Sequence, residues 1–226
     1  MIDFNDLISF LKNPNLEERY EIKSITSFFK LLWRSFLITL GISIAISLFI
    51  STPLRYLNLL PPLKDINFSF LSFLKISFFV PLVEELIFRL PLRISRVNLI
   101  TSLGLILFLI FQNLNIYVSL SFLIVSFGFI ILIIINRSDI LPIGGNFFTK
   151  YYLFIFYSQA ILFGLLHLPN YNLDLKYFYL FPLFIIIYIL IGCLWGYIRV
   201  RFKYGIYACI ITHMIVNSLY YLILAK

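Results

Sequence analysis

The residues best suited to chemistry in this sequence are two adjacent glutamates and two histidines that lie within long apolar stretches. Of the 10 acidic residues, only Glu84 and Glu85 fall inside such a stretch, and both histidines, His167 and His213, lie in one or at its end. A charged side chain at the centre of a membrane costs about 2.5–3.5 kcal/mol on insertion scales, so ionisable groups found there are candidates for function. The sequence therefore predicts a polar site built between apolar helices.

The glutamate pair is followed by an arginine at helical spacing. Glu85 and Arg89 are four residues apart and share one face of a helix, with the acid first, which is the better order for an ion pair. Glu84 is rotated by about 100° and remains free to act as a general base. Pro81 predicts a kink just before the pair. The alternative interpretation is an ion pair near the membrane interface, with Glu84 reaching outward to water.

Each histidine also has a partner four residues away. Phe163 and His167 share one helix face. His213 and Asn217 share another, and two such groups inside an apolar helix need hydrogen-bond partners within the bundle. Taken singly, the first pair is also compatible with a histidine that meets interfacial water. The second is also compatible with a helix–helix hydrogen bond that does no chemistry.

The composition predicts that these helices are embedded in a membrane. Hydrophobic residues make up 62% of the chain and charged residues 12%, about half the share found in soluble domains. The net charge of +8 does not indicate nucleic-acid binding, because the basic residues cluster at the ends of apolar segments. Most of the Lys and Arg residues fall on the side of the N-terminus, which predicts that the N-terminus is inside and the C-terminus outside.

The expected fold is all-α: a polytopic transmembrane helix bundle of about seven spans with an amphipathic N-terminal segment. Residues 1–28 are expected to form a cap on the membrane surface, with a short helix that uses Ile2, Leu7, Ile8 and Leu11 and ends near Asn13-Pro14. Residues 29–226 form the transmembrane domain, and Leu99–Ile135 is too long for one span. The predicted spans are Phe29–Ser51, ended by Thr52-Pro53, then Phe68–Leu90, two short helices within Leu99–Ile135 broken at Gln112–Tyr117, and finally Tyr151–Leu168, Phe178–Ile198 and Gly205–Ala225.

Taken in order, the motifs EExxxR at Glu84–Arg89, FxxxH at Phe163–His167 and HxxxN at His213–Asn217 lie on separate apolar helices. This order resembles the type II CAAX prenyl endopeptidases, also called the Abi or CPBP family of intramembrane proteases. The resemblance covers about residues 68–220. The sequence departs from the family pattern at Leu90, where glycine is common, and in a longer gap before the second motif.

The resemblance implies an endopeptidase that uses an activated water. The expected catalytic residues are Glu84, His167, His213 and Asn217, and the expected supporting residues are Glu85, Arg89 and Phe163. Glu84 and His167 would hold and deprotonate the water. His213 and Asn217 would form an oxyanion hole for the carbonyl oxygen as it gains charge. The Glu85–Arg89 pair would orient Glu84.

No cofactor is expected, because a water activated by glutamate and histidine needs none. The alternative is a zinc ion held by Glu84, His167 and His213, although the sequence lacks HExxH. One difficulty is the depth of these groups in the membrane. The predicted spans place Glu84 toward the inner end of its helix and His167 at the outer end of another.

The expected partners are membrane lipid and a peptide or protein substrate, prenylated or bacteriocin-like by the resemblance, and no nucleic acid. The expected location is the plasma membrane as a multi-pass protein, and the resemblance implies a bacterial inner membrane. Two other functions remain open: a non-enzymatic membrane immunity or interaction protein of the same fold, and a small transporter or proton relay that uses Glu84 and the histidines.

Overall fold

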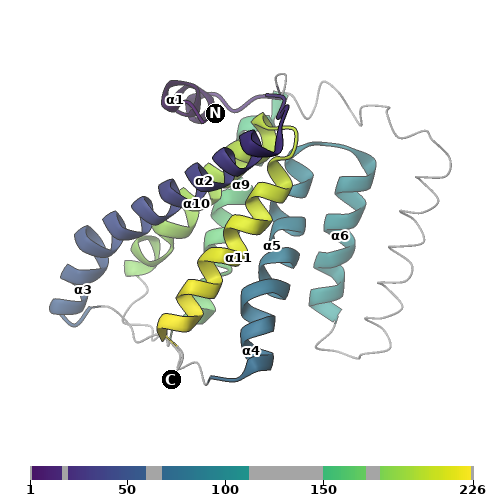
Figure 1. Cartoon of the computed structure of the whole chain (residues 1–226). Coiled ribbons are helices and arrows are strands. Elements are labelled where there is room, and N and C mark those ends of the chain that lie inside the picture. Colours follow the sequence, from purple (N-terminus) through teal and green to yellow (C-terminus); the bar gives the residue numbers. More distant parts are fainter. Residues whose placement is uncertain (1, 17–19, 60–67, 112–149, 172–178, 225–226) are drawn as a thin grey trace.

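The computed structural model describes residues 2–16, 20–59, 68–111, 150–171 and 179–224. Within these residues the chain is helical apart from turns, connecting segments and one isolated parallel β-bridge between Tyr20 and Phe202. The predicted all-α membrane bundle is confirmed (Figure 1). The predicted fourth span and the break at Gln112–Tyr117 lie outside the described residues.

In the part of the chain that the structure describes, four helical runs are long and apolar enough to cross a membrane: Ile25–Tyr56, Tyr152–Asn170, Phe181–Arg201 and Gly205–Ile223. The individual elements before the middle of the chain are α1 (Phe4–Lys12), α2 (Ile25–Ile46), η1 (Ser47–Ser51), α3 (Thr52–Tyr56), α4 (Phe70–Leu74), η2 (Lys75–Phe79), α5 (Val80–Phe88), η3 (Leu90–Leu92) and α6 (Arg96–Phe111). The later elements are α9 (Tyr152–Leu165), η4 (Leu168–Asn170), α10 (Phe181–Arg201) and α11 (Gly205–Leu224).

Pro53 and Pro81 lie inside helical runs, and each follows one π-helical turn. The prediction that the first span ends at Thr52-Pro53 is wrong, because the helix continues through η1 and α3 to Tyr56. In η1 the N–H of Thr52 reaches back five residues to the Ser47 carbonyl. This wider turn makes room for a ring that lacks an N–H, so the helix accommodates the proline without ending. A second π-helical turn, η2, lies directly before Val80 and Pro81, where the sequence predicts a kink.

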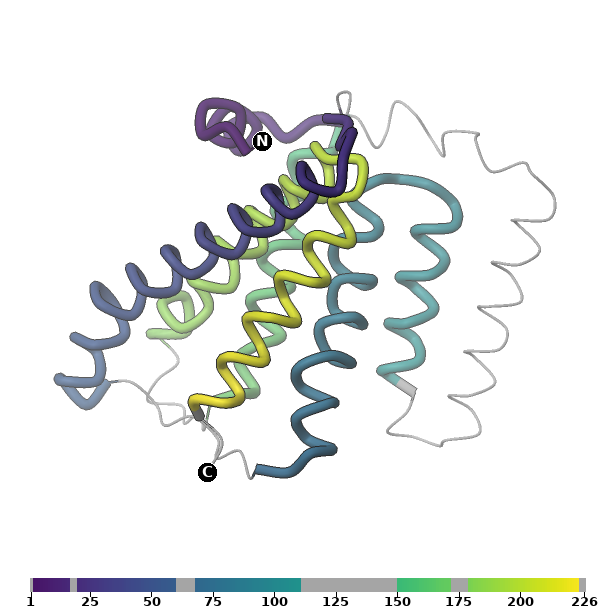
Figure 2. Tube along the Cα trace, viewed as in Figure 1, coloured from purple at the N-terminus to yellow at the C-terminus, as the bar shows by residue number. Residues whose placement is uncertain are grey.

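The helices cross at different inclinations (Figures 1 and 2). The run formed by α2, η1 and α3 lies obliquely, and α11 passes between it and α5. The last described turn of α11 lies at the opposite end of the bundle from α1. This arrangement agrees with termini on opposite sides of the membrane.

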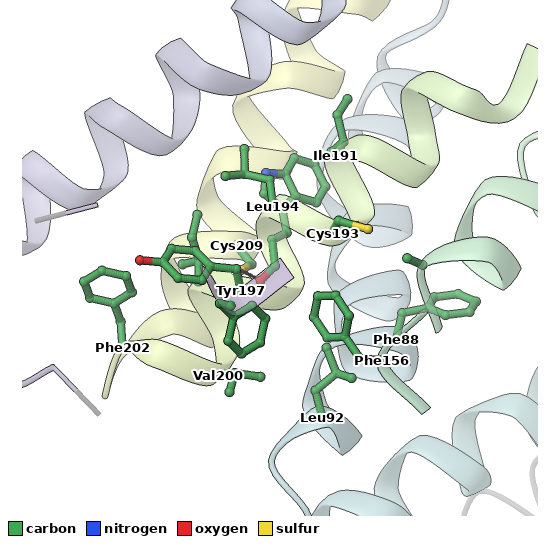
Figure 3. Close-up of a cluster of buried hydrophobic side chains, with 14 of the residues drawn as sticks. Phe88, Leu92, Phe156, Ile191, Cys193, Leu194, Tyr197, Val200, Phe202 and Cys209 are labelled. Atoms are coloured by element: carbon green, nitrogen blue, oxygen red, sulfur yellow. Dashed lines mark hydrogen bonds between the residues drawn. The ribbon is translucent and has the colours of Figure 1, made fainter. Parts of the chain in front are cut away.

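The core is centred on α10, in which every residue from Ile191 to Arg201 is buried. Figure 3 shows part of this core, where Phe88, Leu92 and Phe156 gather beside Cys193. Cys193 and Cys209 are both buried free thiols, as expected for small apolar packing residues.

Helix α1 packs against the C-terminal half of α10. Asp6 accepts a hydrogen bond from the Tyr197 hydroxyl at 2.7 Å and lies 3.5 Å from Arg201. The expected apolar face is partly wrong, because Ile8 is half exposed while Phe10 is fully buried. The ring of Phe10 packs edge-on against Phe156 and Tyr197, with centroids 5.2 and 5.4 Å away.

Gly205 is required by the tight connection from α10 to α11. A Cβ atom at this position would lie 2.1 Å from the Ile198 carbonyl oxygen and 2.9 Å from the Arg199 Cα. Both neighbours are backbone atoms, so neither can move aside without shifting the end of α10.

We therefore expect Gly205→Ala to lower the free energy of unfolding by about 1–3 kcal/mol, the usual cost of forced overpacking. The matched control is Gly41→Ala in α2, because a Cβ there meets nothing within 4 Å. The comparison is made by denaturation of the purified protein in mixed detergent micelles. Equal stability of the two variants would contradict this account of the α10–α11 turn.

Candidate active site

The centre of the site is a carboxylate that contacts two cationic or potentially cationic groups. Glu85 is fully buried, and its Oε1 lies 3.0 Å from Nδ1 of His213 on α11. Its Oε2 lies 3.5 Å from Nε of Arg89, one helical turn further along the chain. A buried carboxylate needs such partners, because removing a charge from water without compensation is costly. Glu85 therefore ties α5 to α11.

Arg89 is buried as well, and its charge is offset mainly by carboxylate and aromatic groups. Its guanidinium carbon lies 3.9 Å from the centroid of the Phe163 ring and 5.7 Å from that of Trp195. Within the described part of the chain its three guanidinium nitrogens make no hydrogen bond. The cation–π contact with Phe163 gives the FxxxH motif a role in supporting the glutamate pair.

Glu84 lies on the other side of His213. Its Oε2 is 3.6 Å from Nε2 of the imidazole, and its side chain is 19% exposed, whereas Glu85 is fully buried. Among the described residues, Glu84 Oε2 makes no hydrogen bond. The imidazole therefore lies between two carboxylates, and the one at Nε2 is both more accessible and less constrained.

Asn217 lies one turn beyond His213 and is held by a backbone carbonyl of η2. Its Nδ2 donates to the Ile76 oxygen at 3.2 Å. In a regular helix this carbonyl would accept from Val80, but in the π turn the Val80 N–H bonds to Lys75 instead. The next residue is Pro81, which has no N–H to offer. The irregular turn and the proline together leave an acceptor for the asparagine.

His167 lies just after the C-terminal end of α9, and its side chain is also oriented by a backbone carbonyl. Its own backbone N–H bonds to Gly164, and its Nδ1 lies 2.9 Å from the Phe163 oxygen. The imidazole stacks on the ring of Tyr188, with centroids 3.9 Å apart. It meets the Phe163 ring edge-on at 4.8 Å.

The structure thus brings the three motifs around the Phe163 ring. This ring contacts Arg89 on one side, and its centroid lies 6.0 Å from that of His213 and 4.8 Å from that of His167. The expected mismatch in depth is therefore smaller than the predicted spans suggest. Direct contacts join Glu84, Glu85, Arg89 and His213, whereas His167 reaches this group through Phe163 and Asn217 lies against Ile76.

Two aromatic residues of α10 that sequence reasoning missed complete these surroundings. The Trp195 ring lies 4.6 Å from the His213 ring, and its indole N–H donates to Thr39 of α2 at 3.1 Å. Tyr188, two turns earlier on α10, stacks on His167. The two residues are seven positions apart and therefore share one helix face. This spacing is the feature of the sequence that could have indicated a shared aromatic surface on α10.

Two cavities lie away from this group, at the end of the bundle where α2 and α11 begin. One has a volume of about 530 Å³, and one of about 210 Å³ adjoins it at Ile22. The residues lining the first are Ile22, Lys23, Ser24, Ile25, Phe28, Tyr204, Tyr207 and Ile211. None of them belongs to the three motifs, so the ionisable contacts, rather than the hollow surface, define the candidate site.

The donors of the alternative zinc site are not gathered into one group. Among the described residues, no three His, Cys, Asp or Glu side chains come close enough together to hold a metal ion. His213 faces a carboxylate from each ring nitrogen, and Nδ1 of His167 faces the Phe163 carbonyl. In this arrangement Glu84, His167 and His213 do not fit a preassembled zinc site.

The second and third motifs lie in the part of the chain that is similar to a known family. Residues 145–219 match the family described as type II CAAX prenyl endopeptidase Rce1-like. The match to this Rce1-like family supports a CAAX-type membrane protease in general. No curated protein and no solved structure gives a significant match to the chain.

The first motif lies outside the residues that match the Rce1-like family, but the fold places it in contact with them. Glu84 and Glu85 of α5 both contact His213, which the match includes. The contact is independent of the sequence comparison, because the match begins more than fifty residues after the glutamates. Two observations therefore support the resemblance that the three motifs indicate. One is the matched segment, which contains the second and third motifs, and the other is the contact of the first motif with His213.

Removing Arg89 alone should be strongly destabilising. We expect Arg89→Met to lower the free energy of unfolding by about 3–5 kcal/mol, because it removes the arginine partner of the buried Glu85 and leaves His213 alone to compensate the two glutamates. The double variant Glu85→Gln/Arg89→Met should recover part of this loss, since the amide can still accept from His213.

The measurement is a double-mutant cycle by denaturation in detergent micelles. Lys203→Met is the control, because its ion pair with Glu21 is exposed on both sides and should contribute little. Additive effects of the two core substitutions would contradict the proposed charge compensation.

Proposed function

We propose that this chain is an intramembrane endopeptidase that hydrolyses a peptide bond with a water activated by Glu84 and His167. The observation that carries the proposal is the contact of the glutamate pair with His213, which lies inside the segment similar to CAAX endopeptidases. A transporter or a simple helix–helix contact would not require these groups to meet beside a histidine and an asparagine at family spacing.

Glu84 is the general base in this proposal. Glu85 is fully buried and is occupied by both Arg89 and His213, so it acts as a structural counter-charge. Glu84 has a more accessible side chain and an oxygen without a hydrogen bond among the described residues. A base must reach the proton that it removes, and only Glu84 of the pair has that freedom.

His213 and Asn217 are proposed to stabilise the oxyanion. Nδ1 of His213 faces the Glu85 carboxylate, which can only accept, so Nδ1 carries a proton. Nε2 lies 3.6 Å from the more accessible Glu84 and is the nitrogen that would donate to a substrate carbonyl. A protonated His213 and Arg89 together would balance the charges of Glu84 and Glu85. Asn217 uses one amide hydrogen for Ile76 and retains a second for the substrate carbonyl.

The proposed setting is a multi-pass protein of a bacterial plasma membrane, with a substrate that is itself anchored at the membrane. Four membrane-length helices among the described residues support the membrane setting, and the CAAX-type match supports a prenylated peptide as the substrate. A bacteriocin-like peptide is the alternative substrate. No nucleic acid is involved in this proposal.

Glu84→Gln should reduce cleavage to background in a reconstituted assay with a prenylated C-terminal peptide, because an amide cannot accept a proton from water. Its matched control is Glu21→Gln, an exposed glutamate in an ion pair far along the chain from the motifs. Full activity of the Glu84 variant would remove this protease mechanism. Wild-type protein that cleaves neither this peptide nor a bacteriocin precursor would favour the non-enzymatic immunity or interaction role.

Asn217→Ala should lower kcat by about 10²–10³, the usual effect of losing one oxyanion donor, with a smaller change in KM. Steady-state kinetics in detergent or proteoliposomes provide the measurement. A loss confined to KM would assign Asn217 to substrate binding in the ground state instead.

The zinc alternative is tested on the same preparation. We expect metal analysis to find no stoichiometric zinc and a chelator to leave cleavage unchanged, because the three donors are not assembled. A stoichiometric zinc that is lost together with activity would reverse the assignment and make Glu84, His167 and His213 its ligands.

A further inference from the structure

The His167 imidazole is held by three groups, one of which no motif contains. Nδ1 lies 2.9 Å from the carbonyl oxygen of Phe163, and the ring of Phe163 meets the imidazole edge-on. The third group is the Tyr188 ring of α10, which stacks on the imidazole with an angle of only 20° between the planes. A ring fixed at one nitrogen and across one face has little rotational freedom left.

The contact with the Phe163 carbonyl also decides which nitrogen is basic. A carbonyl oxygen accepts hydrogen bonds and cannot donate, so Nδ1 must carry the proton. The neutral imidazole then keeps its lone pair on Nε2. Nε2 is the atom that would accept a hydrogen bond from the water, and so hold it for Glu84, in the proposed reaction.

Tyr188 is itself fixed by the chain that follows His167. Its hydroxyl interacts with Asn170 and Tyr171, which come directly after the turn that ends α9. Tyr171 in turn stacks on Phe184, one helical turn before Tyr188, with centroids 5.6 Å apart. The ring that stacks on His167 therefore lies in a group of aromatic side chains between α10 and the end of α9.

The stacking depends on a close approach of α9 and α10. A Cβ atom at Gly164 would lie 2.8 Å from Ile189 Cγ1 and 3.3 Å from the Ile185 carbonyl oxygen. Any larger residue at Gly164 would therefore push the helices apart beside Tyr188. The glycine that follows Phe163 in the second motif thus has a packing role at the level of the histidine.

We propose that Tyr188 is a positioning residue for His167, whose ring sets the imidazole plane and so gives Nε2 a fixed direction. The inference rests on the proposed function for its catalytic consequence, but the stacking itself can be tested without activity. The phenol takes no part in proton transfer, since the contact is made by the face of the ring.

The first test is nuclear magnetic resonance of protein labelled with ¹⁵N-histidine, in which two imidazoles give signals because the chain has 2 histidines. We expect one neutral imidazole with the proton on Nδ1 and with ring protons shifted upfield by Tyr188, and a His167→Gln variant assigns it. Tyr188→Phe should retain that shift and Tyr188→Leu should abolish it, while the His213 signals stay in place. Unchanged His167 signals in Tyr188→Leu would overturn the proposal.

The second test is kinetic. We expect Tyr188→Leu to lower kcat by about tenfold to a hundredfold with KM unchanged, because a small misplacement of a catalytic group is costly. Tyr188→Phe should stay within about twofold of the wild type. The control is Tyr179→Leu on an exposed part of the same region.

The outcomes separate the two proposals. Lost stacking with an unchanged kcat would overturn the positioning role alone, while an active Glu84→Gln variant would overturn the protease mechanism and leave the stacking result standing. If Tyr188→Leu does not fold, Gly164→Ala takes its place and should weaken the same upfield shift and lower kcat. A folded Gly164→Ala variant without either effect would overturn the proposal.

Discussion

A buried carboxylate that needs compensation from two sides organises the interior of this bundle. Glu85 contacts Arg89 within its own helix run and His213 on α11. Arg89 continues the connection, because its guanidinium packs on Phe163 of α9 and its carbonyl accepts a hydrogen bond from Arg199 of α10. Four helices are thereby joined through one ion pair, and an apolar interface alone would not fix their relative register so strictly.

Irregular helix geometry has a second organising effect, since it supplies the acceptors that orient polar side chains. The carbonyl of Ile76 is available to Asn217 because a π turn and a proline remove its ordinary donors. The carbonyl of Phe163 is available to His167 because the last turn of α9 tightens. In both places a backbone carbonyl without its usual helical donor accepts a hydrogen bond from a motif residue.

The sequence was informative about elements and about residue types, and less so about partners. The long apolar runs predicted the helices, and the cost of burying ionisable groups singled out Glu84, Glu85 and the histidines. The contact between Glu85 and His213 could not be predicted, because helical spacing relates residues within one helix and says nothing about which helix lies opposite. The catalytic roles remain predictions.

The other differences between the sequence-based predictions and the structure have similar physical causes. Tyr188 and Trp195 were hidden because aromatic residues in an apolar helix look like ordinary packing residues until their neighbours are known. The helix was expected to end at Pro53, because the sequence does not reveal that a π turn precedes it. Phe10 rather than Ile8 faces the bundle, since α1 packs on α10 and its buried face is set by that contact.

The helices also differ in the length that they offer to a bilayer. The run Ile25–Tyr56 has 32 residues and is about 48 Å long, well beyond a hydrocarbon core of about 30 Å, so its oblique course matches what its length requires. Helix α10 has 21 residues and is about 32 Å long, close to the thickness of that core. An excess of length such as that of Ile25–Tyr56 is accommodated by tilting of the helix. We therefore expect the run of α2, η1 and α3 to remain tilted relative to the bilayer normal, whereas α10 can cross the same core with little excess length.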